Sequence, residues 1–90
     1  SLLDTLLDNV LKKDEKEILD FIRLSSEYET EMIVDELSLY LKERLFARDS
    51  RFSPLIIDRF FRILAESKEM LALGSDGEFV LSLGLFKMME

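Results

Sequence analysis

The sequence has 90 residues, 48% of them apolar, and contains no cysteine, histidine or tryptophan. A chain of this length supports one hydrophobic core. Without cysteine and histidine it has no disulfides, thiolate nucleophile, imidazole base or zinc site built on those ligands. The net charge of −7 opposes contact with nucleic acid, because phosphates require a concentrated basic face. We expect one non-enzymatic domain over residues 1–90.

The N-terminal residues predict neither a membrane anchor nor a signal peptide. No apolar run approaches the roughly 18 residues that a membrane span needs, and residues 1–9 lack the basic, apolar and small-residue order of a leader. These features predict a cytoplasmic protein with no membrane partner. The chain also begins with serine and enters an amphipathic pattern at once, so we expect it to be a piece of a longer protein.

The first quarter of the chain predicts two helices. Apolar residues at spacings of three and four form a stripe over residues 2–12, which predicts a first helix there. Asp14 and Glu17 have the spacing of a capping pair, so a second helix begins at this point. We expect that helix to stop at Ser25 and Ser26.

A third, longer helix is predicted from Ser26 to about Ala47. Ser26 and Glu29 repeat the capping spacing, and apolar residues then recur at helical intervals. The first turns are acidic and the last are basic, which suits the helix dipole. The dipole therefore explains these charges without a binding site.

A fourth helix is predicted after the polar connector of residues 47–52. Ser53 supplies a cap and Pro54 a first-turn proline, while Phe52 is placed to pack against Ile57 as a hydrophobic staple. The boundary between connector and helix is therefore predicted at Ser53.

The fourth helix is predicted to end near Leu73, because Gly74 suits the left-handed position that closes many helices. Ser75 and Glu78 then have capping spacing for a fifth helix over residues 76–89. Short connections favour antiparallel neighbours. The sequence thus predicts an all-α fold, a compact bundle of about five helices.

The last two predicted helices carry apolar residues around most of their circumference, wider than the stripe of about 100° on a surface helix. They either form a buried hairpin or present apolar surface to another chain, and the two interpretations are compatible. Methionine also fills gaps in ordinary cores. The side chains that we single out as a possible subunit interface are Phe60, Phe61, Phe79, Phe86, Met88 and Met89.

The charged residues predict no catalytic, cofactor-binding or metal site. Neighbouring acids such as Glu29 and Glu31 lie in one helix start, whereas catalysis needs carboxylates that converge from different elements. One basic cluster could contact phosphate or an acidic partner, or could be a helix end followed by a solvated loop. Its members are Lys42, Arg44, Arg48, Arg51, Arg59 and Arg62.

Three stretches of sequence carry a resemblance to a known family. They are LLDTLLDNVLKKDEKEILDFI, in which a turn with lysines and Asp14 joins two apolar helices, the helix end LSLYLKERLFARD, and FSPLIIDRFFRILAESKEMLALGSDGEFVLSLGLFKMME. Their order resembles the third, collar-forming domain of the gamma/tau subunit of the bacterial DNA polymerase III clamp loader. The chain departs from that pattern at Ser82, where the family often has an acid, and at Gly84, where it often has alanine.

The resemblance implies a structural function. Nucleotide-binding and lid domains of the parent ATPase subunit would precede residue 1, so this fragment would hydrolyse nothing and need no cofactor. Its partners would be other clamp-loader subunits, whose collar domains pack side by side in a ring while the sliding clamp is placed on primed DNA. The isolated fragment could be monomeric or self-associate.

Two alternatives remain beside the collar domain. One is a small acidic helical adaptor or regulatory domain that binds a single protein partner. The other is an enzyme of carboxylate chemistry, which would need a pocket lined by acids from separate helices.

Overall fold

Five α-helices and no strand make up the computed structural model, which describes all residues 1–90 and confirms the predicted all-α bundle. The radius of gyration is 12.2 Å, and about 12 Å is expected for a compact domain of this length. The helices are α1 (Leu2–Lys12), α2 (Glu15–Leu24), α3 (Thr30–Phe46), α4 (Pro54–Ala72) and α5 (Gly77–Met89), with a 3₁₀ turn at Ser25–Glu27 between α2 and α3.

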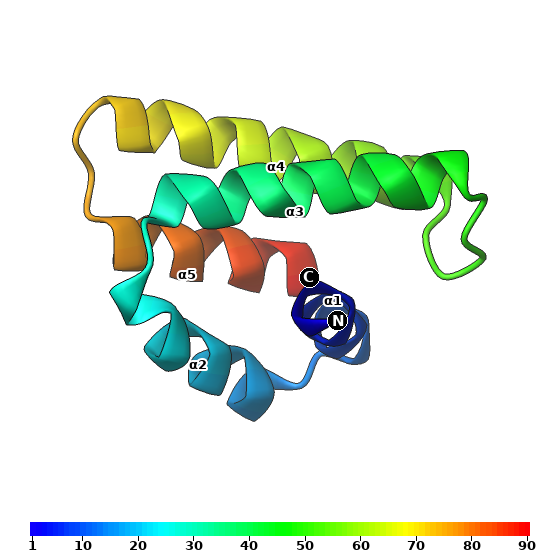
Figure 1. Cartoon of the computed structure of the whole chain (residues 1–90), viewed down its shortest axis with the longest axis horizontal. Coiled ribbons are helices and arrows are strands. Elements are labelled where there is room, and N and C mark those ends of the chain that lie inside the picture. Colours follow the sequence, from blue (N-terminus) through cyan, green and yellow to red (C-terminus); the bar gives the residue numbers. More distant parts are fainter.

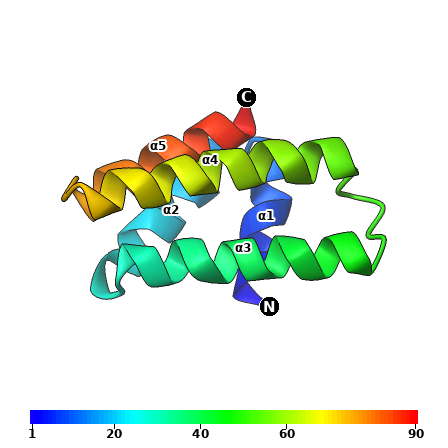
Figure 2. The same ribbon diagram turned by 90° about the horizontal axis from the view of Figure 1, so that it is seen from above.

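The helices lie in three layers (Figure 1). An antiparallel pair, α3 and α4, forms the upper layer. Helix α5 turns back beneath α4 and runs in the opposite direction, and α1 and α2 form the lower layer. Seen from above, α1 crosses beneath the α3–α4 pair (Figure 2). Helix α5 contacts each of the other four helices, so it is the central element of the fold.

The central position of α5 explains its apolar circumference. Val80 and Leu85 are almost fully buried on it, and buried residues from all five helices join a common core. The buried apolar residues that form this cluster are Leu6, Leu7, Val10, Ile18, Ile22, Ile33, Val34, Leu37, Leu41, Phe52, Ile57, Phe60, Ile63, Leu64, Leu81, Leu85, Met88 and Met89. Most of the fifth helix is therefore covered by the chain itself.

Most helix ends agree with the sequence predictions. The side chains of Asp14 and Ser53 accept hydrogen bonds from backbone N–H groups three residues later, as N-caps do. Phe52 and Ile57 are both buried in the common core, as the predicted staple requires. At the end of α4, Gly74 has φ of 89°, and its N–H donates to the carbonyl of Leu71 at 3.0 Å, which closes the helix.

The predicted start of the third helix was wrong by four residues. Ser26 lies in the 3₁₀ turn, and α3 begins at Thr30. The buried Ser25 hydroxyl donates to the carbonyl of Ile22 at 2.9 Å, and the N–H of Tyr28 donates to the carbonyl of Ser25 at 3.0 Å. The serines therefore close α2 instead of opening α3.

The predicted cap of the fifth helix was wrong by one residue. Asp76, not Ser75, accepts the N–H of Phe79, at 2.9 Å, and α5 begins at Gly77. A carboxylate at this position is also stabilised by the positive end of the helix dipole.

Two glycines allow α5 to approach its neighbours closely. A Cβ on Gly77 would lie 3.0 Å from the Cβ of Thr30 and closer still to its hydroxyl, at the start of α3. A Cβ on Gly84 would lie 3.1 Å from Oγ of Ser67, a buried residue of α4. Gly84 therefore stands where α4 and α5 nearly touch.

Candidate protein-binding surfaces

The structure divides the predicted interface residues into two groups. Phe60, Met88 and Met89 lie in the core of the chain itself, with at most 7% of their surface exposed. Phe61 is 38% exposed and Phe79 64% exposed, while Phe86 is half-buried against the core. The second group alone is available to another molecule.

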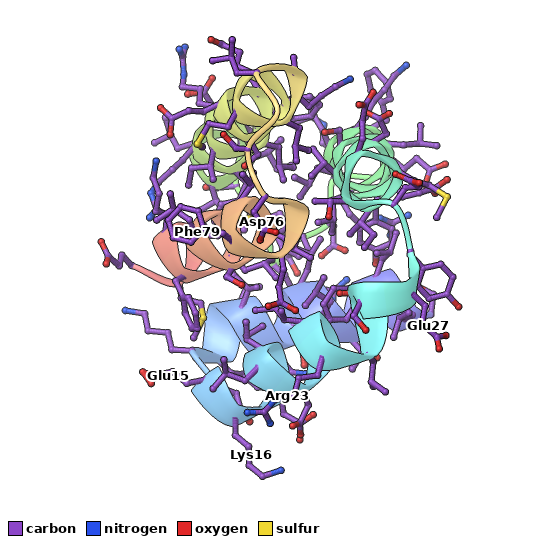
Figure 3. All side chains as sticks on the ribbon, turned by 90° about the vertical axis from the view of Figure 1, so that its left-hand side faces the viewer. Glu15, Lys16, Arg23, Glu27, Asp76 and Phe79 are labelled. Atoms are coloured by element: carbon purple, nitrogen blue, oxygen red, sulfur yellow. The ribbon has the colours of Figure 1, made fainter.

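The outer side of α5 carries a short apolar stripe. Phe79, Leu83 and Phe86 follow one another at spacings of four and three, so they share one face of the helix. Leu83 is 37% exposed. Figure 3 shows Phe79 at the start of α5, on the side turned away from α3. We call Phe79 and Leu83 with the adjoining Phe86 the α5 stripe.

Four members of the predicted basic cluster have partners within the chain, although two of these four, Arg59 and Arg62, remain exposed. Arg59 donates to the backbone carbonyls of Lys87 and Met88 at the end of α5, where helix carbonyls lack partners. Arg62 pairs with Asp58 at 2.9 Å, as its spacing predicts. Glu66 also lies four residues from Arg62, but it pairs with Lys87 from α5 instead.

Two further members of that cluster hold the connector between α3 and α4. The guanidinium of Arg51 lies 2.7 Å from a carboxylate oxygen of Asp4 in α1 and 2.8 Å from one of Asp49. Tyr40 donates its hydroxyl to the same Asp4. Arg44 lies 3.6 Å from Asp49 and over the Tyr40 ring, with 5.2 Å to its centroid.

The connector's charges perturb one another as this geometry requires. Hydrogen bonds from Arg51 hold the pKa of Asp49 at about 2, below its ordinary 3.8. Hydrogen bonds from Arg51 and then Tyr40 lower the pKa of Asp4, and burial raises the pKa of Tyr40. The shifts of the two carboxylates have their causes in partners within the chain, as in a structural ion-pair network.

A pocket of about 500 Å³ lies where the start of α1, the end of α2 and the start of α3 meet. Its volume is within the range of ligand pockets, about 300–1,000 Å³. Seven of its ten lining residues are apolar. We call it the acidic pocket, and its lining residues are Leu2, Leu3, Phe21, Leu24, Ser25, Glu27, Tyr28, Met32, Ile33 and Glu36.

The acidic pocket is open to solvent, and the charges of its acidic side chains have no basic partner. Leu24 is 76% exposed, Tyr28 59% and Met32 48%. Glu27 and Glu36 have no salt-bridge partner, and no basic residue lines the pocket. The arrangement therefore favours an apolar group accompanied by positive charge.

Sequence reasoning missed this pocket. Its walls come from three segments, and the expected helix from Ser26 would have placed Tyr28 inside a helix. One signal was present: Met32 and Leu39 lie outside the buried stripe of α3 and are 48% and 50% exposed. Apolar residues at helical spacing that leave the core face point to a second surface.

No group of three or more acidic side chains comes together in a way that could hold a metal ion. None of the helices is both long and apolar enough to cross a membrane. Comparisons with protein-family models, with curated proteins and with solved structures found no match to the chain. Function is therefore inferred from the chain's own surfaces, together with the segment pattern described above.

Proposed function

We propose that this chain is an oligomerisation domain of the collar type, similar to that of the clamp-loader gamma/tau subunit. In this role it packs with other clamp-loader subunits in the cytoplasm. The ATPase domains, which lie outside residues 1–90, would then load the sliding clamp during DNA replication. The fragment itself carries out no catalytic step and uses no cofactor.

The α5 stripe is the observation that supports this proposal most. Helix α5 is in contact with all four other helices, yet Phe79 is 64% exposed and Leu83 37% exposed. Phe61 on α4 is also exposed, at 38%. Exposed apolar patches on small proteins mark contacts with other proteins, and aromatic side chains are enriched in such contacts.

The charge supports a protein partner over DNA. The chain carries a net charge of −7. Of the six residues in the predicted basic cluster, four make ionic contacts or hydrogen bonds within the chain. An acidic bundle of this kind repels phosphate while apolar faces bind protein. This division suits a collar that holds together domains which contact DNA themselves.

A double variant of the α5 stripe tests the proposal. Phe79→Asp with Leu83→Asp places two charges in the expected contact and leaves the core residues unchanged. We expect the unmodified chain to co-purify with the other clamp-loader subunits in size-exclusion chromatography with light scattering. The double variant should bind them at least about tenfold more weakly, with an unchanged circular dichroism spectrum.

The matched control is Leu19→Asp. Leu19 is 40% exposed on α2, between Lys16 and Arg23, which Figure 3 shows on the opposite side of the molecule from α4. Loader binding should survive this change. Absence of any complex between the unmodified chain and loader subunits would refute the collar function. A stable 1:1 complex with one protein of another kind would favour the small acidic adaptor instead.

A further inference from the structure

The C-terminal end of α3 carries a surface that complements the acidic pocket. Phe46, the last residue of α3, is 74% exposed. Lys42 lies one turn earlier on the same side, and Arg48 follows the helix; both are exposed and neither has a salt-bridge partner. Glu43, in the same turn, is an unpaired acid, so the charges of Lys42, Glu43 and Arg48 sum to +1. We call Phe46 with Lys42 and Arg48 the basic knob.

The knob and the pocket lie at opposite ends of the same helix. Helix α3 has 17 residues, which separates its ends by roughly 25 Å, and the longest extent of the molecule is 34 Å. Figure 1 shows the start of α3 above α2 and its end at the connector to α4. One molecule therefore cannot insert its knob into its own pocket, and using one surface leaves the other free.

We propose that a second copy of this chain docks head-to-tail, with its basic knob in the acidic pocket. The Phe46 ring would enter the apolar lining, and Lys42 and Arg48 would face Glu27 and Glu36. This inference rests on the proposed function, because it names one contact through which such an oligomerisation domain assembles.

Charge complementarity favours a second copy of this chain as the molecule that occupies the acidic pocket. Two chains of charge −7 repel each other in most orientations. The head-to-tail orientation brings the unpaired acids of one copy to the unpaired bases of the other, so it is favoured over the alternatives. A contact between two different surfaces continues from copy to copy, and it forms a ring or a longer assembly.

A mixing experiment with two variants tests the proposal. Phe46→Ser removes the knob and leaves the pocket, whereas Met32→Lys places a positive charge in the pocket and leaves the knob. In sedimentation velocity over a concentration series, the unmodified chain should self-associate. Each variant alone should self-associate at least about tenfold more weakly. An equimolar mixture should form a 1:1 dimer and nothing larger, because only one productive contact remains.

A charge exchange tests the orientation independently. Glu36→Lys or Lys42→Glu alone should weaken self-association, and the double variant should restore it, since each contact then has opposite charges again. The control for Lys42→Glu is Lys13→Glu, which changes the charge equally at an unpaired base outside pocket and knob. Self-association should fall more with Lys42→Glu than with this control.

Several results would overturn the head-to-tail contact. These are a monomeric chain at every concentration, self-association indifferent to Phe46→Ser and Met32→Lys, or a mixture that forms no dimer. If loader subunits still bind through the α5 stripe, the proposed function stands and this contact alone fails. If the mixture dimerises but no loader subunit binds, the contact stands and the collar function fails.

Discussion

The two connections that flank α3 are built in opposite ways. After α3, the connector of residues 47–53 is held by Arg51, whose charge is shared between Asp49 and Asp4 of α1. Before α3, residues Ser25–Glu27 form a 3₁₀ turn beside an open apolar pocket, and Glu27 has no ionic partner. In the sequence, residues 47–52 predict a polar connector, whereas the residues from Ser26 onward predict the start of a helix. The difference shows that a charged loop is structural or available for binding according to where its counter-charges lie.

Truncation of the core between the two connections should have the largest effect. Leu37 lies midway along α3 and is fully buried. Leu37→Ala should lower the free energy of unfolding by about 2–5 kcal/mol, because it removes apolar contacts and leaves a cavity. Urea denaturation followed by circular dichroism measures the change. The control Leu39→Ala, at a residue 50% exposed on the same helix, should stay within about 0.5 kcal/mol.

The next largest effect should come from closing the gap between α5 and the start of α3. Gly77→Ala should destabilise the chain by about 1–3 kcal/mol, because the new methyl group meets Thr30. Thr30→Ala in the same chain should recover part of the loss, since the nearest atom is the threonine hydroxyl. A rise in stability of up to about 1 kcal/mol, as helix propensity alone would give, would contradict the close approach.

The ionic contacts of the connector after α3 should make the free energy of unfolding depend on pH. The folded-state pKa of Asp49 is about 2 and its ordinary value is 3.8, so the unfolded chain binds more protons between these values. The free energy of unfolding should therefore fall as the pH drops from about 4 towards 2. Asp49→Asn should make that fall shallower.

Asp58→Asn is the matched control for the loss of an aspartate–arginine pair. Asp58 also pairs with an arginine, but its side chain is 58% exposed, so solvent screens the pair. Its removal should change the free energy of unfolding at neutral pH by no more than about 0.5 kcal/mol. Equal slopes for the Asp49→Asn variant and the unmodified chain in urea titrations would show that the Arg51 cluster does not secure the connector.

The pocket before α3 should show the smallest effect on stability. Leu24 is 76% exposed, so Leu24→Ser should change the free energy of unfolding by no more than about 0.5 kcal/mol. Phe21→Ser, at the half-buried wall of the same pocket that packs on the core, should cost clearly more. Thermal denaturation of the two variants side by side would separate the rim of the pocket from its base.

The helices themselves were predictable because their signals are local. The stripe of residues 2–12, the cap at Ser53 and the stop at Gly74 depend only on neighbours within a few positions, and all three are confirmed. The predicted start of α3 was wrong because two local signals competed there. Ser25 bonds backward to Ile22, so the serine pair ends one helix instead of opening the next.

The candidate surfaces were predictable only in part. The apolar excess of the last two helices is visible in the sequence, but burial divides it: Phe60 lies in the core and Phe79 on the surface. Periodicity could not make this division, because α5 is apolar on nearly every side. Which side remains exposed depends on where four other helices pack.

By itself, the sequence determined the number of helices, most of their ends, the acidic charge and an excess of apolar surface. These follow from residue types and from spacings of three to four residues along the chain. The tertiary structure alone decided which side of α5 is enclosed, that Arg51 reaches Asp4 across 47 positions and that three segments form the acidic pocket. Burial and charge pairing are relations between residues far apart in the chain, so only the packed fold can assign them.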